Sequence, residues 1–409
     1  MSPATRAVVG TDRLAALRAA TAGLQPPFAV VDLDAFDANA AALTARAAPG
    51  TTIRLASKSV RCRALTDRAL ARPGFAGVLA LTLPEATWLA ADPSSGIDDV
   101  VVGYPSVDTT AIAALAADPA LAARVTLMVD SVESLDVVEA AAGRSPAAPV
   151  KVCLDLDAAL ELLGGRVHLG PLRSPVRTPA QAVALARAVL ARPWLHLDGL
   201  MAYEGQIAGT ADAAGPRLRQ AAVRAMQRAS ARELAERRAA VVEAVSALAP
   251  LRFVNGGGTG SVEQTSAEPA VTEVAAGSGL YAPALFDSYR RFRARPAAYF
   301  VQPVVRRPAA RVVTALGGGW VASGPPGPDR QPVVAWPPGL RFSPWEGAGE
   351  AQTPLLGSPA AQVRLGQHIW FRHAKAGELC ERVGELHLVA GEDLVGAVPT
   401  YRGEGRAFL

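Results

Sequence analysis

The sequence contains 409 residues, half of them apolar, and its formal net charge is only +4. This length exceeds that of one typical compact domain and predicts a large domain joined to a smaller one. Acidic residues accompany the basic ones along the chain, which argues against a nucleic-acid-binding surface. The three cysteines, Cys62, Cys153 and Cys380, are far apart, so neither a disulfide framework nor a four-ligand structural zinc site is encoded.

No feature of the sequence indicates a membrane protein or an exported one. The N-terminus lacks a basic segment followed by an apolar stretch, and no apolar run is long enough to span a bilayer. We therefore expect a soluble, cytoplasmic protein that acts on a small molecule.

Short β-rich runs alternate with alanine- and leucine-rich helical stretches over most of the chain. The predicted strands are 28–33, 52–56, 77–81, 98–103, 124–130, 150–157, 195–203, 251–258 and 270–277. Strands that alternate with helices form parallel βαβ units. Eight or more such units predict an α/β fold of the (β/α)8, TIM-barrel type. The arginine-rich stretch 216–238 has helical spacing and acids within it, which is typical of a solvated helix face.

The alternation stops near Arg295. The remaining sequence is rich in glycine and proline, with short alternating apolar runs and no long helix, which is typical of a small antiparallel β domain. We expect the barrel over 26–294, opened by the strand 28–33, and the β domain over 295–409. A helix at about 10–24, within the N-terminal segment 1–25, is a candidate to pack on the β domain.

Lysine is scarce in this chain. Only three of its 41 Lys and Arg residues are lysine, namely Lys58, Lys151 and Lys375. A guanidinium stays protonated, whereas a desolvated lysine amine can lose its proton and form an imine with a carbonyl. Lys58 follows the strand 52–56 by two residues, at the barrel end where active sites lie. Lys58 is therefore a candidate to form an imine, and the alternative is that it is an ordinary surface lysine. Lys151 lies at the start of a strand, where it is either a surface residue or one with a role inside the barrel.

Two glycine-rich stretches, 255–261 and 275–281, follow the last two predicted strands. Their backbone N–H groups can approach a phosphate closely, and this fold often holds phosphate at its final loops. Thr259, Ser278 and the phenol of Tyr281 add hydroxyl donors. Ordinary tight turns are the alternative. With a lysine at the same end of the barrel, the loops predict a phosphate-bearing aldehyde, and pyridoxal phosphate fits that description.

Five segments resemble a known family. They are PFAVVDLDAFDAN (27–39), RLASKSVRC (54–62), GLMAYEGQ (199–206), NGGGTGS (255–261) and E-x-x-x-G-S-G-L-Y-x-x-x-L-F-D (273–287). In this order they resemble the fold-type III pyridoxal-phosphate enzymes, the alanine racemase N-terminal-domain superfamily. Within it, the chain is most similar to the D-threonine aldolase and D-serine dehydratase branch.

The resemblance implies roles for particular residues. Lys58 would carry the cofactor as an aldimine, and Tyr203 would lie near the cofactor ring. The residues implied at the phosphate are Gly257, Gly258, Thr259, Gly260, Gly277 and Ser278, to which the loop chemistry adds Tyr281. The resemblance also implies a homodimer in which each active site is shared between the subunits.

The sequence departs from the family at the cofactor ring. Family members place an arginine there, next to a glycine, to contact the pyridine nitrogen. The corresponding region here reads LGGRVHLGPLRSP, and Arg166, Arg173 and His168 are all candidates for that contact. Gln206 also replaces the histidine that relatives commonly have after Gly205.

A second departure concerns a divalent metal. In the metal-dependent branch a C-terminal histidine is followed two residues later by Asp or Cys. Here His373 is followed by Lys375, an ammonium that cannot bind a metal while protonated. A metal site of His373 with Cys380 or Glu378 stays open. Without a metal, His373 would deprotonate a substrate hydroxyl, and Lys375 would bind a carboxylate or transfer a proton. The alternative is that this stretch is only a polar turn between two strands and that Cys380 is inert.

These residues favour a lyase. Pyridoxal phosphate stabilises a carbanion at Cα, from which aldol cleavage, loss of a β-hydroxyl with deamination, and racemisation can all follow. The C-terminal polar residues favour aldol cleavage or deamination of D-configured β-hydroxy amino acids. The alternatives are an amino acid racemase, a non-catalytic pyridoxal-phosphate-binding protein of cofactor homeostasis, and a barrel that binds another phosphorylated ligand.

Overall fold

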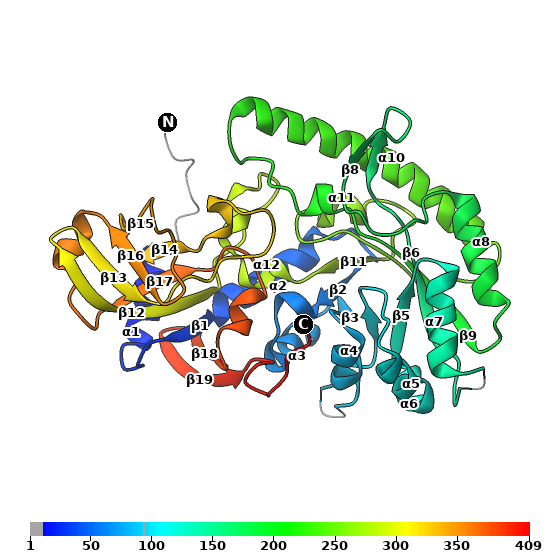
Figure 1. Cartoon of the computed structure of the whole chain (residues 1–409), viewed down its shortest axis with the longest axis horizontal. Coiled ribbons are helices and arrows are strands. Elements are labelled where there is room, and N and C mark those ends of the chain that lie inside the picture. Colours follow the sequence, from blue (N-terminus) through cyan, green and yellow to red (C-terminus); the bar gives the residue numbers. More distant parts are fainter. Residues whose placement is uncertain (1–10, 93–94, 145) are drawn as a thin grey trace. The chain divides into compact units, whose positions relative to one another are not determined.

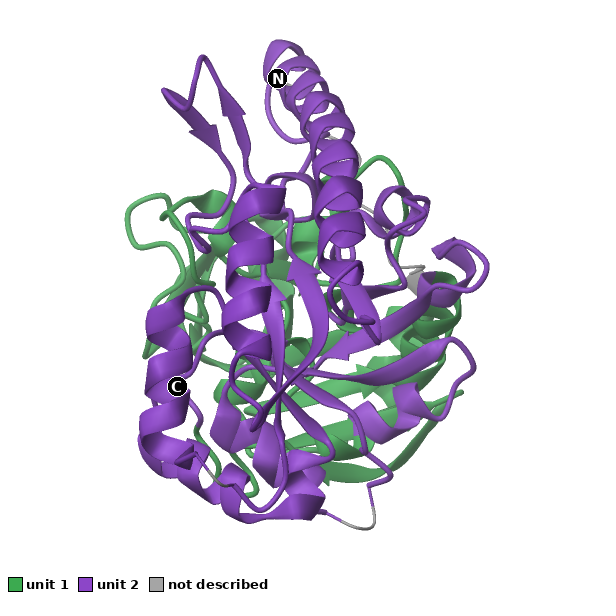
Figure 2. Cartoon of the chain, turned by 90° about the vertical axis from the view of Figure 1, so that its right-hand side faces the viewer, with its two compact units in different colours: residues 1–42, 59–64, 278–407 green, residues 43–58, 65–277, 408–409 purple. Residues whose placement is uncertain are grey.

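The computed structural model describes residues 11–92, 95–144 and 146–409 (Figure 1). The chain divides into two compact units, coloured separately in Figure 2. The barrel unit consists of Leu43–Lys58, Leu65–Gly277 and Phe408–Leu409. The β unit consists of Met1–Ala42, Ser59–Ala64 and Ser278–Ala407. Among the described residues, no helix has both the length and the apolar character that crossing a membrane requires.

Eight parallel strands close a barrel in the order β10-β11-β2-β3-β4-β5-β6-β9, which confirms the predicted (β/α)8 fold. Their bounds are β2 (Thr52–Ala56), β3 (Phe75–Ala80), β4 (Val100–Val102), β5 (Val125–Val129), β6 (Val150–Asp155), β9 (Leu195–Ala202), β10 (Phe253–Gly256) and β11 (Glu273–Ala276). All residues of β4 and β5 are buried. A parallel strand that is covered on both faces is mostly apolar, and these valine-rich runs fit that pattern with Thr126 as their one polar residue.

Helices follow the strands and cover the barrel. Their bounds are α4 (Leu83–Ala90), α5 (Thr109–Ala117), α6 (Pro119–Ala122), α7 (Val132–Ala142), α8 (Pro179–Leu190), α9 (Gly205–Ala208), α10 (Arg217–Ser246) and α11 (Val262–Ser266), while α2 (Leu33–Arg46) and α3 (Arg63–Leu70) contribute residues to both units. Local signals fix where they begin. The α8 helix starts at Pro179, and Thr178 and Gln181 form a reciprocal capping box there. The predicted helix over 216–238 is α10, which continues to Ser246.

The β unit contains a nine-stranded sheet that is antiparallel apart from one pair of strands, which confirms the predicted second domain type. Its strands are β1 (Phe28–Asp32), β12 (Ala298–Ala309), β13 (Val312–Leu316), β14 (Val333–Trp336), β15 (Arg341–Phe342), β16 (Gln352–Leu356), β17 (His368–Arg372), β18 (Glu385–Ala390) and β19 (Asp393–Pro399). The helix α1 (Thr11–Ala20) packs on this sheet. Leu14 and Leu17 of α1 share one core cluster with Phe28 and Trp370.

The strand that was expected to open the barrel lies in the other sheet. β1 pairs antiparallel with β12 and parallel with β18, inside the β unit. All five of its residues are buried, as those of a barrel strand would be, so its apolar pattern fits either sheet. The barrel closes instead through the pairing of β11 with β2. Its strands therefore span 52–276, and the expectation of a barrel strand at 28–33 was wrong.

Candidate functional site

Lys58 lies directly after β2, at the C-terminal end of the barrel. A single 3-10 turn, Ser57–Ser59, follows the strand, and the Ser57 hydroxyl donates to the Leu79 carbonyl of β3 at 3.0 Å. This bond holds the turn against the neighbouring strand. The Lys58 amine then donates to the Tyr104 hydroxyl at 2.7 Å, and Tyr104 comes from the loop after β4. The predicted imine residue is thus fixed between the ends of separate strands.

Arg173 and Tyr203 extend this group. The guanidinium carbon of Arg173 lies 4.8 Å from the ring centre of Tyr203 and 5.5 Å from that of Tyr104. Tyr203 follows the end of β9, and burial raises the pKa of its phenol while the charge of Arg173 opposes that rise. The structure therefore brings together Lys58, Tyr203 and Arg173, which the sequence predicted, with Tyr104, which it did not. We call these four residues the lysine cluster.

Asp155 is a second residue that sequence reasoning missed. It ends β6, is 7% exposed, and has a pKa raised to about 7. Burial is the main cause; Arg173 acts against it, and the nearby acids Asp130 and Asp157 reinforce it. A carboxyl with this pKa exchanges its proton near neutral pH. The available sequence signal was its position, because it closes a strand on the same face as Lys58.

Arg173 lies in the chain between two anchored segments. An antiparallel hairpin of β7 (Leu160–Leu162) and β8 (Val167–Leu169) precedes it, and His168 of this hairpin contacts the Pro171 carbonyl at 3.3 Å. On the other side, the Ser174 hydroxyl donates to the Asp155 carbonyl at 2.6 Å. Arg166 lies in the exposed turn of the hairpin. Of the three candidates for the cofactor ring, Arg173 is therefore the one that reaches Tyr203.

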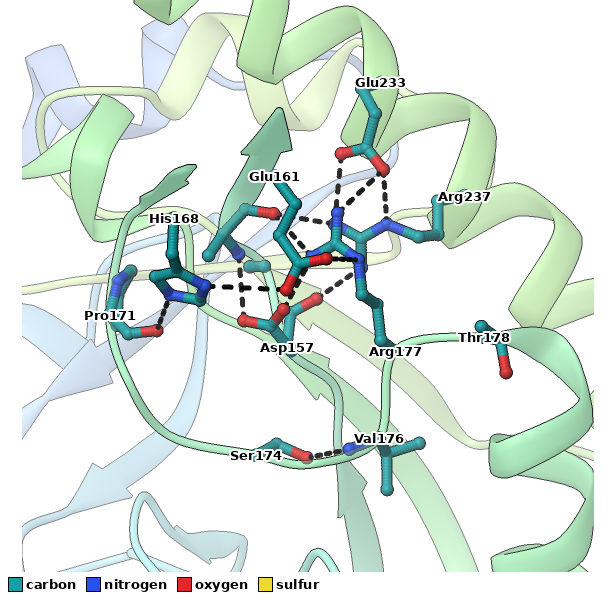
Figure 3. A network of polar contacts seen from close by, with 12 residues as sticks. Asp157, Glu161, His168, Pro171, Ser174, Val176, Arg177, Thr178, Glu233 and Arg237 are labelled. Atoms are coloured by element: carbon teal, nitrogen blue, oxygen red, sulfur yellow. Dashed lines mark hydrogen bonds and ion pairs between the residues drawn. The ribbon is translucent and has the colours of Figure 1, made fainter. Parts of the chain in front are cut away.

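An ion-pair network fastens the next residues to α10 (Figure 3). Arg177 contacts Asp157 at 2.6 Å, Glu233 at 3.3 Å and Glu161 of the hairpin at 3.4 Å. Glu233 in turn pairs with Arg237 at 2.6 Å. Arg177 thereby links the hairpin, the loop that carries Arg173 and the long helix.

The predicted phosphate loop between β10 and α11 requires glycine. Gly257 has a φ of +74°, and a Cβ there would lie 2.8 Å from Val274. A Cβ on Gly258 would lie 2.9 Å from Ala208 and 3.4 Å from the Tyr203 ring. The backbone of this loop therefore passes close to the lysine cluster, as a loop that cradles a cofactor must.

The N–H groups of two predicted phosphate residues bond within the chain. Gly257 donates to the Glu204 carboxylate at 3.0 Å, and Gly258 donates to the Ser261 hydroxyl at 3.2 Å. Glu204 is 1% exposed and also pairs with Arg238 at 3.1 Å, so the loop is anchored to a buried charge pair. Thr259 and Gly260 are the members of the predicted set at the tip of this loop.

The second predicted loop crosses from one unit to the other. Gly277 follows β11 in the barrel unit, and Ser278 begins α12 (Ser278–Tyr281) of the β unit. Tyr281 is fully buried, and its hydroxyl donates to the Val60 carbonyl at 2.9 Å. Its phenol thus has an interior protein partner, which differs from the predicted exposure to a phosphate.

Two of the C-terminal polar residues, His373 and Cys380, lie beside Tyr281 in the β unit. His373 follows β17 with its ring edge-on to Tyr281, at 6.2 Å between ring centres. The Cys380 sulfur lies 3.9 Å from the Tyr281 hydroxyl. Burial, helped by the charge of Arg372 and opposed by the Ala298 backbone, lowers the pKa of His373 to about 3. An imidazole with a lowered pKa is a weak base at neutral pH, and the base role expected for His373 stays a prediction.

Comparison with known proteins places the fold. The family described as "Alanine racemase, N-terminal domain" matches residues 31–284, and no protein with a curated description matches the chain. D-threonine aldolase from Filomicrobium marinum is similar over 93% of this chain and 95% of its own, with a TM-score of 0.72 and 22% identity. D-threo-3-hydroxyaspartate dehydratase from Delftia sp. HT23 is similar over 92% of this chain and 98% of its own, with a TM-score of 0.69 and 22% identity. Alanine racemase from E. faecalis is similar over 90% of each chain, with a TM-score of 0.58 and 16% identity. The family match confirms the predicted superfamily resemblance, and the structures share the fold.

Proposed function

The chain belongs to the alanine racemase N-terminal domain family, and from this premise we propose that it is a pyridoxal-phosphate-dependent lyase. Its proposed substrates are small D-configured β-hydroxy amino acids, and its reaction is aldol cleavage or β-elimination with deamination. D-threonine aldolase and D-threo-3-hydroxyaspartate dehydratase support this reading, because their fold extends over nearly the whole chain. We propose a homodimer as the assembly, as the sequence resemblance implied.

The lysine cluster is the observation that carries the proposal. The scarce Lys58 amine lies 2.7 Å from a tyrosine hydroxyl at the C-terminal end of the barrel, beside a loop in which a Cβ on Gly258 would meet Tyr203. These features fit pyridoxal phosphate, which needs an amine for its aldehyde, a flat wall for its ring and a close backbone for its phosphate. The residues that would hold it are Lys58, Arg173, Tyr203, Thr259, Gly260, Gly277 and Ser278. When bound, the cofactor withdraws electrons from the bonds at the Cα of the amino acid.

The surrounding side chains would orient groups and move protons. Tyr104 accepts the Lys58 hydrogen bond and so fixes the direction of the amine. Arg173 provides a permanent positive charge over Tyr203. Asp155, with its pKa near 7, is the proposed proton acceptor for the substrate hydroxyl, because a catalytic base works best when its pKa is close to the working pH.

A racemase is the second candidate function. Racemisation needs a proton donor on each face of Cα, and Lys58 and a tyrosine are the candidates for these two roles. The two proposals differ in their products. A lyase releases an aldehyde or a keto acid, whereas a racemase returns the opposite enantiomer.

The test is a visible absorbance spectrum of the purified protein, followed by product assays with D-threonine and D-serine. We expect a yellow protein that borohydride bleaches, with the reduced cofactor attached to Lys58, and an aldehyde or keto acid as product. The opposite enantiomer as the sole product would select the racemase. A coloured protein with no turnover would indicate a cofactor-binding protein. A protein that stays colourless after addition of pyridoxal phosphate would refute the proposal.

A further inference from the structure

The β unit contains a cavity of about 350 Å³ that the lysine cluster does not use. Its polar lining combines an indole, an imidazole and charges of both signs, contributed by Trp320, Ser323, His373, Lys375, Glu378 and Arg382. This volume exceeds that of several water molecules, which each occupy about 30 Å³ in the liquid. The cavity is therefore large enough for a small organic ligand.

His373 is the unusual member of this lining. It is 3% exposed, and among the described residues neither ring nitrogen has a partner of full hydrogen-bond geometry, although the Ala298 backbone is near enough to raise the pKa of the ring. A buried polar group without a partner loses its bonds to water and gains nothing in return, which costs about 1–3 kcal/mol. A ligand in the cavity would supply the missing bond. The neutral imidazole has one N–H donor and one acceptor nitrogen for this purpose.

A divalent metal does not fit these side chains. Lys375, two residues after His373, brings an ammonium to the lining and donates to the Ser323 hydroxyl at 3.2 Å. The Cys380 thiol donates to the Val60 carbonyl at 3.2 Å, so it already has a protein partner. No group of three potential ligands occurs in the part of the chain that the structure describes. The predicted metal site of His373 and Cys380 therefore lacks a suitable donor set.

The acidic members of the lining have partners. Both oxygens of Glu378 accept from the Ser323 amide, at 3.1 and 3.0 Å. Glu381 pairs with Arg61. Arg382 lines the same cavity and is exposed, so it adds a second positive charge at the solvent side. The remaining polar groups of the lining are therefore mainly hydrogen-bond donors and cations.

We propose that this cavity binds a small carboxylate, which accepts hydrogen bonds from the His373 ring and the Lys375 ammonium, and that it binds no divalent metal. Charge-assisted bonds of this kind are about twice as strong as neutral ones. The lysine thus supplies the positive charge that a metal ion would otherwise provide. Every residue named in this lining belongs to the β unit.

Calorimetric titration of the full chain with succinate tests the carboxylate. Succinate has no amino group, so it cannot react with a carbonyl held by Lys58. We expect saturable binding to the wild-type protein, weakened at least about tenfold in Lys375→Gln, which is the loss of one charged hydrogen bond, and abolished in Lys375→Asp. Lys151→Gln is the matched control: that lysine lies in the barrel unit, contacts the Ala123 carbonyl and should leave the affinity unchanged.

Two further measurements complete the test. Lys58→Arg should bind succinate like the wild type, so a failure of the proposed reaction would leave this result standing. Titration of the EDTA-dialysed protein with MnCl2 and with ZnCl2 should show no stoichiometric binding. The proposal is overturned if succinate fails to bind, if Lys375→Gln binds it as the wild type does, or if either metal binds one to one in a His373-dependent way.

Discussion

The two ends of the barrel differ in the partners of their charged side chains. At the N-terminal end, Arg54 is 1% exposed and pairs with Glu273 at 2.6 Å and with Asp99 at 2.8 Å. Arg252 joins Asp99 at 2.8 Å to Asp198 at 2.6 Å. At the C-terminal end, Lys58 and Arg173 lie over tyrosine rings, and Arg173 also acts on the Asp155 carboxyl. One end is a closed ion network, and the other presents amines, phenols and a carboxyl with a shifted pKa.

This difference separates stability from chemistry. Burial alone would raise the pKa of Asp99, but Arg54 and Arg252 lower it to about 2, so this acid stays ionised and paired. Asp155, at the other end, has a pKa of about 7 because burial outweighs Arg173. In this fold the N-terminal end commonly contributes stability and the C-terminal end catalysis. The two ends should therefore respond differently to mutation.

The largest effect is expected from Lys58→Arg. The substitution keeps the charge but removes the amine that reacts with the cofactor aldehyde, so activity should fall by about a thousandfold or more. The measurement is kcat with D-threonine, alongside the melting temperature, which should change little. Lys151→Arg is the control and should be fully active. Wild-type activity in the Lys58 variant would remove Lys58 from the site.

Breaking the ion-pair network at the N-terminal end of the barrel should lower the stability of the protein and leave its activity largely intact. Arg54→Met leaves the buried Glu273 without its guanidinium partner, whereas the partly exposed Asp99 keeps Arg252, and we expect a cost of about 3–5 kcal/mol in the free energy of unfolding. Urea unfolding followed by circular dichroism measures this loss, and activity per folded molecule should persist. Arg144→Met is the comparison, because the Arg144 side chain is 82% exposed and its ion pair with Glu139 should matter little. Equal stability of the two variants would contradict a structural role for the Arg54 network.

Arg173→Lys tests the flat face that the lysine cluster offers. A lysine keeps the charge but loses the planar group over Tyr203 and Tyr104, a contact worth about 1–2 kcal/mol. We expect the dissociation constant of pyridoxal phosphate to rise about tenfold, as measured by absorbance titration of the protein freed of cofactor. Arg166→Lys, in the exposed hairpin turn, should leave that constant unchanged. The same weakening in both variants would show that only overall charge matters.

The smallest effect concerns pH. The raised pKa of Asp155 means that the folded state binds a proton more tightly than the unfolded chain. Its contribution to stability is present below the unfolded pKa of about 4 and is lost as pH rises through about 7. Asp155→Asn should therefore reduce the fall in melting temperature between pH 5 and pH 8. If the melting temperature of the variant fell as much as that of the wild type, a group other than Asp155 would cause the pH dependence.

Sequence reasoning located Lys58 but only part of its surroundings. Lys58 could be placed because a strand end followed by a lysine is a local pattern with a known position in a barrel. Tyr104 and Asp155 could not be placed, because their proximity to Arg173 arises from three different strands. The burial of His373 and Tyr281 was equally hidden, since nothing in a polar stretch specifies which side chains turn inward.

The sequence by itself determined the alternation of strands and helices, the change to an antiparallel domain and the end of β2 at which Lys58 lies, because these follow from local periodicity and turn chemistry. Only the tertiary structure decided which strands pair. The apolar run of β1 fits two sheets equally, and its partners β12 and β18 lie hundreds of residues away in the chain. The tertiary structure also decided that Asp99 is ion-paired with a lowered pKa while Asp155 has a raised pKa. The pKa of a carboxyl depends on burial and on neighbours that only the fold brings together.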